Sequence, residues 1–220
     1  MIGGSTMIRG IILSLFSITF LLWIEQSVEV TYIWKTAAKV TLFLLVPLLL
    51  FRKTGFPFLR LVQTDRKSML IAIGSGVAIM GIIFAAFIIL QPFIDIAALL
   101  VDLASAGITT TTFPFIALYI LFGNSMLEEF YFRGLLPNLV GKSRIRFILP
   151  SFLFAIYHIS IFLPWFSSAL LILAVTGLWV GGVIFQLANE KSGTILPSWT
   201  IHMCADISVL LIGVYIMYFY

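Results

Sequence analysis

Long apolar runs are the feature that most constrains what this chain can fold into. The 220-residue sequence is 61% hydrophobic and 10% charged, which excludes an ordinary soluble domain. A run of about 20 apolar residues can cross the hydrocarbon core of a bilayer as a helix. Because lipid offers the backbone no hydrogen-bond partners, such runs must be helical. The sequence therefore predicts an all-α transmembrane helix bundle, a single membrane domain with short connections and no soluble appendage.

The apolar runs divide the chain into about seven predicted spans. They cover about residues 7–24, 34–51, 69–90, 113–137, 147–163, 165–187 and 195–220. The first run lacks the small-residue cleavage site of a signal peptide, so we expect it to be an uncleaved span. Residues 92–112 contain Asp95 and Asp102 and end in a Thr run, which favours a short helix at the membrane interface. If this segment dips into the membrane, the number of spans becomes eight.

The distribution of charge predicts the orientation of the bundle. The connections after the second, fourth and sixth spans hold most of the Lys and Arg residues, including Lys142, Arg144 and Arg146. The connections after the first and third spans are acidic, with Glu25, Glu29, Asp95 and Asp102. The positive-inside rule then places the N-terminus in the cytoplasm of a multi-pass cell-membrane protein. We read the net charge of +4 as a signal of orientation within membrane lipid and expect no nucleic-acid partner.

Small residues in two spans predict close helix packing. They are Gly74, Gly76 and Gly81 in the third span, and Gly177, Gly181 and Gly182 in the sixth. The single cysteine, Cys204, permits no intrachain disulfide, and we expect it to pack as a small hydrophobic side chain.

Two adjacent carboxylates and an arginine lie within the fourth predicted span. A charged side chain at mid-bilayer depth costs about 2.5–3.5 kcal/mol on insertion scales, so it is rare there without a function. Glu129 and Arg133 are four residues apart and share a helix face, so they can form an ion pair. Glu128 is turned about 100° away and is expected to have no local cation. We expect Lys35 and Lys39, near the start of the second span, to extend toward the interface.

The only two histidines also lie within predicted spans. His158 is in the fifth span, and His202 is in the seventh, four residues before Asp206 on the same helix face. Such a cluster on three helices could bind a metal, relay protons or activate water.

Three motifs, in this order and on separate helices, resemble those of a known family: Glu128-Glu129-x-x-x-Arg133, Phe154-x-x-x-His158 and His202-x-x-x-Asp206. The family is that of the CAAX-protease and bacteriocin-processing (CPBP, or Abi) intramembrane peptidases. The resemblance covers roughly residues 113–212, which would form the catalytic helices. Residues 1–112 supply transmembrane helices that are not specific to the family. The last motif of the family more often ends in Asn, where this chain has Asp206.

The resemblance implies hydrolysis of a peptide bond in a membrane-associated peptide or protein, as by type II CAAX prenyl endopeptidases. It implies that Glu128 is the general base and acts with His158 on a water molecule, with Glu129 beside it. It also implies that His202 and the residue at 206 stabilise the oxyanion. An anionic Asp206 is a poor donor, so it would have to be protonated, orient His202 or bind a cation. A zinc site at Glu128, His158, His202 and Asp206 and a metal-free glutamate mechanism fit the sequence equally.

Other classes of function fit less well. The chain has no His-Glu-x-x-His pair, and Ser125 lacks the following Gly of a rhomboid-like nucleophile, so we expect it to serve helix packing. We likewise interpret Phe130, Tyr131 and Phe132 as lipid or helix contacts. A proton- or ion-coupled transporter would show two related halves, which the sequence lacks. A catalytically silent interaction protein, such as a bacteriocin self-immunity factor, would keep the same site residues.

Overall fold

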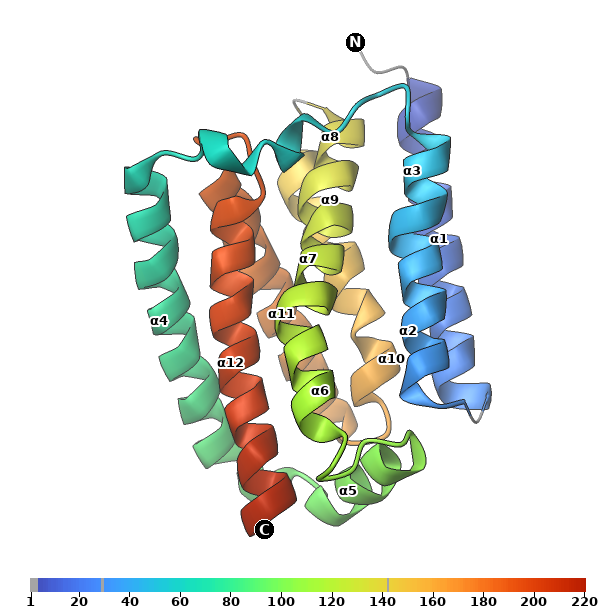
Figure 1. Cartoon of the computed structure of the whole chain (residues 1–220), viewed down its shortest axis with the longest axis vertical. Coiled ribbons are helices and arrows are strands. Elements are labelled where there is room, and N and C mark those ends of the chain that lie inside the picture. Colours follow the sequence, from blue (N-terminus) through green and yellow to red (C-terminus); the bar gives the residue numbers. More distant parts are fainter. Residues whose placement is uncertain (1–3, 29, 142) are drawn as a thin grey trace.

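The computed structural model describes residues 4–28, 30–141 and 143–220, and within them the regular structure is entirely helical. Glu29 and Lys142, which contribute to the predicted loop charges, lie outside the described residues. Figure 1 shows the helices as a bundle whose long axes run in roughly the same direction. The predicted all-α fold is therefore confirmed.

Six helical runs in the described part of the chain are long and apolar enough to cross a membrane. They are Gly4–Ser27 (α1), Tyr32–Leu50 (α2 Tyr32–Val40, η1 Thr41–Leu45 and α3 Val46–Leu50), Arg66–Phe93 (α4 Arg66–Leu90 and η4 Gln91–Phe93), Ile145–Phe162 (α9 Ile145–Tyr157 and α10 Ile159–Phe162), Ser168–Asn189 (α11) and Leu196–Phe219 (α12). A further run, the fourth in order along the chain, consists of α6 (Phe113–Leu118), η5 (Tyr119–Asn124), α7 (Ser125–Glu128), η6 (Glu129–Leu135) and α8 (Leu136–Val140). In this run η5 and η6 are π-helical. Together the seven runs match the predicted number of spans.

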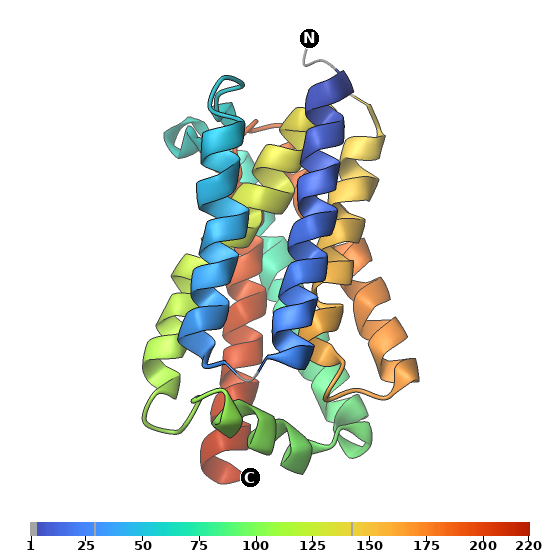
Figure 2. The same cartoon turned by 90° about the vertical axis from the view of Figure 1, so that its right-hand side faces the viewer.

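The short helix predicted between the third and fourth spans is present as α5 (Ile96–Ser105). Ten residues of α-helix extend about 15 Å, which is half the thickness of a hydrocarbon core. Asp95 caps α5 by accepting a hydrogen bond from the amide of Ala98 at 2.9 Å. Asp102 accepts one from the indole of Trp165 at 2.8 Å, which ties α5 to the segment before α11. Figures 1 and 2 show α5 across the end of the bundle nearer the C-terminus, so it does not add an eighth span.

The other end of the bundle holds the connections that carry the basic residues. The turns η2 (Pro57–Leu59) and η3 (Leu61–Gln63), the end of α8 and the connection from α11 to α12 lie there together with the N-terminus (Figure 1). Asp65 caps α4 and accepts hydrogen bonds from the amide and the hydroxyl of Ser68, which lower the pKa of its carboxyl group. The charge asymmetry read from the sequence is thus an asymmetry between the two ends of the fold.

The buried core lies where the second helical run meets the fourth and fifth. Phe43 stacks on Tyr131 with ring centroids 4.6 Å apart and meets Phe132 and Tyr157 edge to face. All four side chains are buried, so Tyr131 and Phe132 are helix contacts. Large apolar side chains on the outer faces are exposed instead, among them Ile33, Leu49, Ile88 and Phe115. Apolar exposure on this scale suits a multi-pass membrane protein surrounded by lipid.

Only part of the predicted glycine packing is found. A Cβ on Gly76 of α4 would lie 2.6 Å from Sγ and 2.9 Å from Cβ of Cys204 in α12. A Cβ on Gly182 of α11 would likewise lie 2.9 Å from Cβ of Ser151 in α9. The prediction was wrong for the remaining four, where a methyl group in place of the hydrogen would have no neighbour within 4 Å: Gly74, Gly81, Gly177 and Gly181. The spacing of glycines reports a helix face, but which glycine lies at the crossing point depends on how the helices are rotated.

The packing of α4 on α12 predicts a difference between two glycines on one helix. Gly76→Ala should destabilise the bundle by about 1–3 kcal/mol, because the methyl group has no room beside Cys204. The control, Gly74→Ala, places the same methyl group where the structure has open space and should leave stability unchanged or slightly higher. Thermal unfolding in detergent measures both variants, and equal effects would contradict the assigned contact.

Seven spans predict that the two ends of the chain lie on opposite sides of the membrane. A reporter fused after Tyr220 should behave as extracytoplasmic, and one fused before the first span should behave as cytoplasmic. Figure 1 places the two termini at opposite ends of the bundle, as this topology requires. A cytoplasmic signal from the C-terminal fusion would rule the topology out.

Candidate active site

The predicted site residues come from three helical runs. Glu128 is the last residue of α7, and Glu129 is the first residue of the π-helical segment η6. His158 occupies the turn between α9 and α10, and His202 and Asp206 follow one another on α12. π-Helical turns and helix breaks of this kind are frequent at functional sites, because they redirect side chains without ending the helix. Here the change of helix type falls between the two glutamates.

The two oxygens of Glu128 have different surroundings. Oε1 accepts a hydrogen bond from Nδ2 of Asn124 at 3.0 Å and lies 3.5 Å from Nζ of Lys39. Oε2 lies 4.0 Å from Nε2 of His158 and 3.7 Å from Nε2 of His202. The side chain is buried, with an exposed fraction of 1% for the residue. One oxygen is thus held by the protein, and the other faces two imidazole rings.

The prediction that Glu128 has no local cation was therefore wrong. Lys39 comes from the second helical run, 89 residues earlier in the chain. It does not extend toward the interface, as its position near a span start suggested, but turns into the bundle, where 16% of its side chain is exposed. Lys35, one turn earlier, pairs with Glu25 at 2.9 Å. A lysine within an otherwise apolar run was the only signal of this contact in the sequence, and its partner could not be read from spacing.

Glu129 joins the histidine of α12 to the arginine of its own helix. Its Oε1 accepts a hydrogen bond from Nδ1 of His202 at 2.8 Å and lies 3.9 Å from Nε of Arg133. The predicted ion pair is present, and its two side chains are fully buried. The hydrogen bond to His202 was not predicted. Because a carboxylate only accepts, Nδ1 of His202 carries a proton, and the ring is held in one orientation.

His158 is held by its own helix. Its Nδ1 lies 2.9 Å from the carbonyl oxygen of Phe154, one turn earlier. Since a carbonyl can only accept, Nδ1 carries the proton, and a neutral ring presents the lone pair of Nε2 toward Glu128. The Phe154 and Tyr157 rings pack against the imidazole, with centroids at 4.4 and 5.0 Å. The spacing of the motif Phe154-x-x-x-His158 therefore corresponds to this backbone hydrogen bond.

Asp206 completes the cluster. Its Oδ1 lies 3.7 Å from Nε2 of His202, and its Oδ2 is buried with no hydrogen-bond partner among the described residues. The expected i,i+4 proximity is present, but Glu129 and not Asp206 orients the imidazole through Nδ1. The five predicted site residues are thus linked to one another by contacts of 4.0 Å or less.

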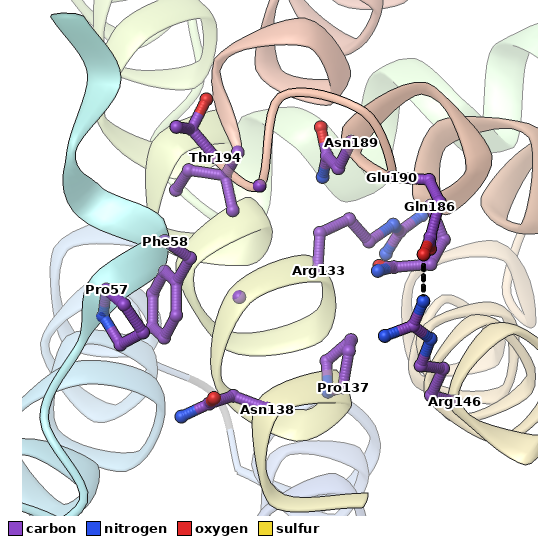
Figure 3. A pocket seen from close by; sticks show the side chains of 13 residues that line it. Pro57, Phe58, Arg133, Pro137, Asn138, Arg146, Gln186, Asn189, Glu190 and Thr194 are labelled. Atoms are coloured by element: carbon purple, nitrogen blue, oxygen red, sulfur yellow. Dashed lines mark hydrogen bonds and ion pairs between the residues drawn. The ribbon is translucent and has the colours of Figure 1, made fainter. Parts of the chain in front are cut away.

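Arg133 lies behind this cluster, on the side of the basic connections. Its guanidinium group stacks 3.9 Å above the ring of Phe154, and a cavity of about 160 Å³ opens beyond it. Figure 3 shows this cavity between η2, α8 and the connection from α11 to α12, with Gln186 beside Arg133 and an ion pair of Arg146 with Glu190 at its rim. The nitrogens of Arg133 have no hydrogen-bond partner among the described residues, so Glu129 and the aromatic rings are what offset the cost of burying its charge.

The four candidate metal ligands were tested against the geometry of zinc. Two imidazoles and two carboxylates are ligand types that zinc accepts. Ligand atoms about 2.0–2.2 Å from one tetrahedral zinc ion lie about 3.3–3.6 Å from one another. The separations are 4.0 Å for Glu128 with His158 and 3.7 Å for His202 with both Glu128 and Asp206. No three His, Cys, Asp or Glu side chains of the described residues are placed to hold a metal ion. The side chains as placed therefore do not form a zinc site.

Comparison with known proteins identifies the segment that carries this cluster. Residues 109–208 match the family model described as Type II CAAX prenyl endopeptidase Rce1-like. The match includes Glu128, Glu129, His158, His202 and Asp206, and it confirms the resemblance that the motifs indicate. No curated protein and no solved structure matches the chain. The match supports a protease of the CAAX type.

The fully buried contacts of Glu129 predict that this residue stabilises the fold. Glu129→Gln leaves Arg133 without its counter-charge and should destabilise the bundle by about 3–5 kcal/mol. The matched control is Glu190→Gln, which makes the same chemical change in a partly exposed ion pair with Arg146 and should cost about 0–1 kcal/mol. Unfolding curves in detergent compare the two variants. Equal losses would show that the buried pair has no special role in stability.

Proposed function

We propose that this chain, whose residues 109–208 match the type II CAAX prenyl endopeptidases, is an intramembrane endopeptidase that uses glutamate-activated water. Its substrate is a peptide bond of a membrane-associated peptide or protein. The observation that carries the proposal is the position of Oε2 of Glu128, which faces Nε2 of both histidines at 3.7 and 4.0 Å inside a buried cluster.

These separations favour a bridging water molecule. Distances of 3.7 and 4.0 Å are too long for direct hydrogen bonds but are spanned by one water. A water at this place can donate one hydrogen to Oε2 of Glu128 and the other to Nε2 of His158, whose Nδ1 is committed to the carbonyl of Phe154. The oxygen of the water is then directed away from both partners, toward a substrate carbonyl carbon.

In the proposed reaction, Glu128 is the general base. It takes a proton as the water oxygen bonds to the carbonyl carbon, and a tetrahedral oxyanion forms. The carboxyl group then passes this proton to the amide nitrogen as the carbon–nitrogen bond breaks. The products are a new carboxyl group and a new amine, so no other reactant is needed.

His202 and Asp206 are the proposed stabilisers of the oxyanion. Nδ1–H of His202 is held by Glu129, which fixes the direction in which Nε2 points. Nε2 lies 3.7 Å from both Glu128 and Asp206, so a proton on it is balanced by two acidic groups and can be donated to the oxyanion. A protonated Asp206 would supply a second donor, because its Oδ2 is buried without a partner among the described residues. Asp206 would thus stabilise the oxyanion at the position where this motif more often has Asn.

The proposal predicts that Glu128→Gln abolishes hydrolysis while the bundle still folds. The amide keeps the shape of the side chain but cannot accept the proton, and loss of a general base lowers kcat by about 10²–10⁴-fold. The unfolding temperature of Glu128→Gln should fall less than that of Glu129→Gln, because Lys39 still donates a hydrogen bond to Asn124. Glu190→Gln is the control for activity, since it lies outside the cluster.

The assay follows cleavage of a membrane-anchored peptide by mass spectrometry, with and without a prenyl group on the same peptide. Near-normal turnover by Glu128→Gln would exclude Glu128 as the base. If the wild-type chain cleaves no member of a panel of membrane-associated peptides, the alternative of a catalytically silent interaction protein replaces the peptidase.

A further inference from the structure

We infer that Lys39 is a positioning residue for Glu128, so that the second membrane helix completes a site whose other members lie on later helices. This inference rests on the proposed peptidase function. Lys39 lies outside residues 109–208, the part of the chain that matches the protease family. The proposal therefore extends the site to an N-terminal region that the motifs do not include.

The contacts of Lys39 are directed at one oxygen of Glu128. Nζ donates a hydrogen bond to Oδ1 of Asn124 at 2.7 Å and lies 3.5 Å from Oε1 of Glu128. Nδ2 of Asn124 in turn donates to the same Oε1 at 3.0 Å. The three groups form a closed set in which the amide takes one hydrogen bond from the lysine and gives one to the carboxylate. With Oε1 held twice, the free oxygen that faces His158 and His202 is Oε2.

The packing around Lys39 fixes where its ammonium group lies. The residue precedes the π-helical segment η1 (Thr41–Leu45), which holds the buried Phe43. Phe43 stacks on Tyr131 and meets Tyr157, and Nζ of Lys39 lies 5.2 Å from the centroid of the Tyr157 ring. The aromatic core that joins the second helical run to the fourth and fifth therefore also sets the distance between Lys39 and Glu128. A cation facing an aromatic ring and a carboxylate is placed for attraction to both.

The balance of charge in the cluster gives a second reason for a lysine. Glu128 and Glu129 are buried carboxylates on consecutive residues, and Arg133 pairs with Glu129. Lys39 supplies the second cation, at the carboxylate that the ion pair of Glu129 leaves unpartnered. Without it, the amide of Asn124 would be the only donor to Oε1 of Glu128, while the proton on Nε2 of His202 lies on the side of Oε2. Attraction toward His202 would then favour a different position of the Glu128 carboxylate.

The test replaces Lys39 by Met, which keeps an unbranched side chain of similar length but has no charge and no donor. Displacement of the base should lower kcat by about 10–100-fold while KM changes by less than about threefold, because the lysine does not need to touch the substrate. Lys39→Arg should recover most of kcat, since a cation and donors return to the same place. A purely structural role would affect the amount of folded protein but not kcat per folded molecule.

Lys35→Met is the matched control. This lysine is one turn away on the same helix and also forms an ion pair, but its partner is Glu25, which is not a member of the cluster. It should keep kcat near the wild-type value. The inference is overturned if Lys39→Met turns over normally, or if Lys35→Met loses as much activity as Lys39→Met.

A cycle of unfolding measurements separates this inference from the proposed function. Lys39→Met should lower the unfolding temperature in the wild-type background, where it leaves Glu128 without its cation, and should lower it less in the Glu128→Gln background. This difference can be measured even if the chain cleaves no peptide. Equal shifts in both backgrounds would show that the two side chains are not coupled, and would overturn the positioning role while leaving a Glu128-dependent peptidase intact.

Discussion

Acidic side chains buried among apolar helices need partners within the bundle, and this requirement organises the centre of the structure. Lipid supplies neither counter-charge nor hydrogen bonds, so an unpartnered carboxylate there costs several kcal/mol. Glu128 is held by Asn124 and Lys39, and Glu129 by His202 and Arg133. These contacts connect the second, fourth and seventh helical runs. Polar contacts that would be weak on a water-exposed surface therefore determine which helices meet at the site.

The imidazole of His202 connects the two halves of the cluster. Its Nδ1 contacts Glu129, and its Nε2 lies 3.7 Å from Glu128 and from Asp206. Adjacent glutamates on one helix point in different directions, so a planar ring with two nitrogens is suited to reach both. The structural pair of Glu129 and Arg133 is thereby linked to the proposed catalytic base. The contacts of the buried ion pair and those of the proposed base therefore meet at one imidazole ring, so an ion pair alone does not account for both glutamates.

The aromatic shell around the cluster has two consequences. Phe154 contacts His158 and His202 and stacks on Arg133, while Tyr157 borders His158 and Lys39. These rings keep the polar groups from relaxing away from one another, because rotation of any one of them would open a void in a closely packed core. They also lower the local polarity, which strengthens each electrostatic contact inside the shell. A cluster of charged groups within a membrane needs both effects, since the surrounding lipid cannot hold such groups in place.

The sequence by itself determined the class of fold, the approximate bounds of the helices and the local pairs. Apolar length sets a span, and a separation of four residues sets a helix face, so the ion pair of Glu129 with Arg133 and the proximity of His202 to Asp206 could be predicted. Only the tertiary structure decided the contacts between distant segments. Lys39 reaches Glu128 and Gly76 meets Cys204 because of how whole helices are rotated and π-helical turns shift their faces. That rotation is set by packing among all the helices together, and no spacing within one helix encodes it.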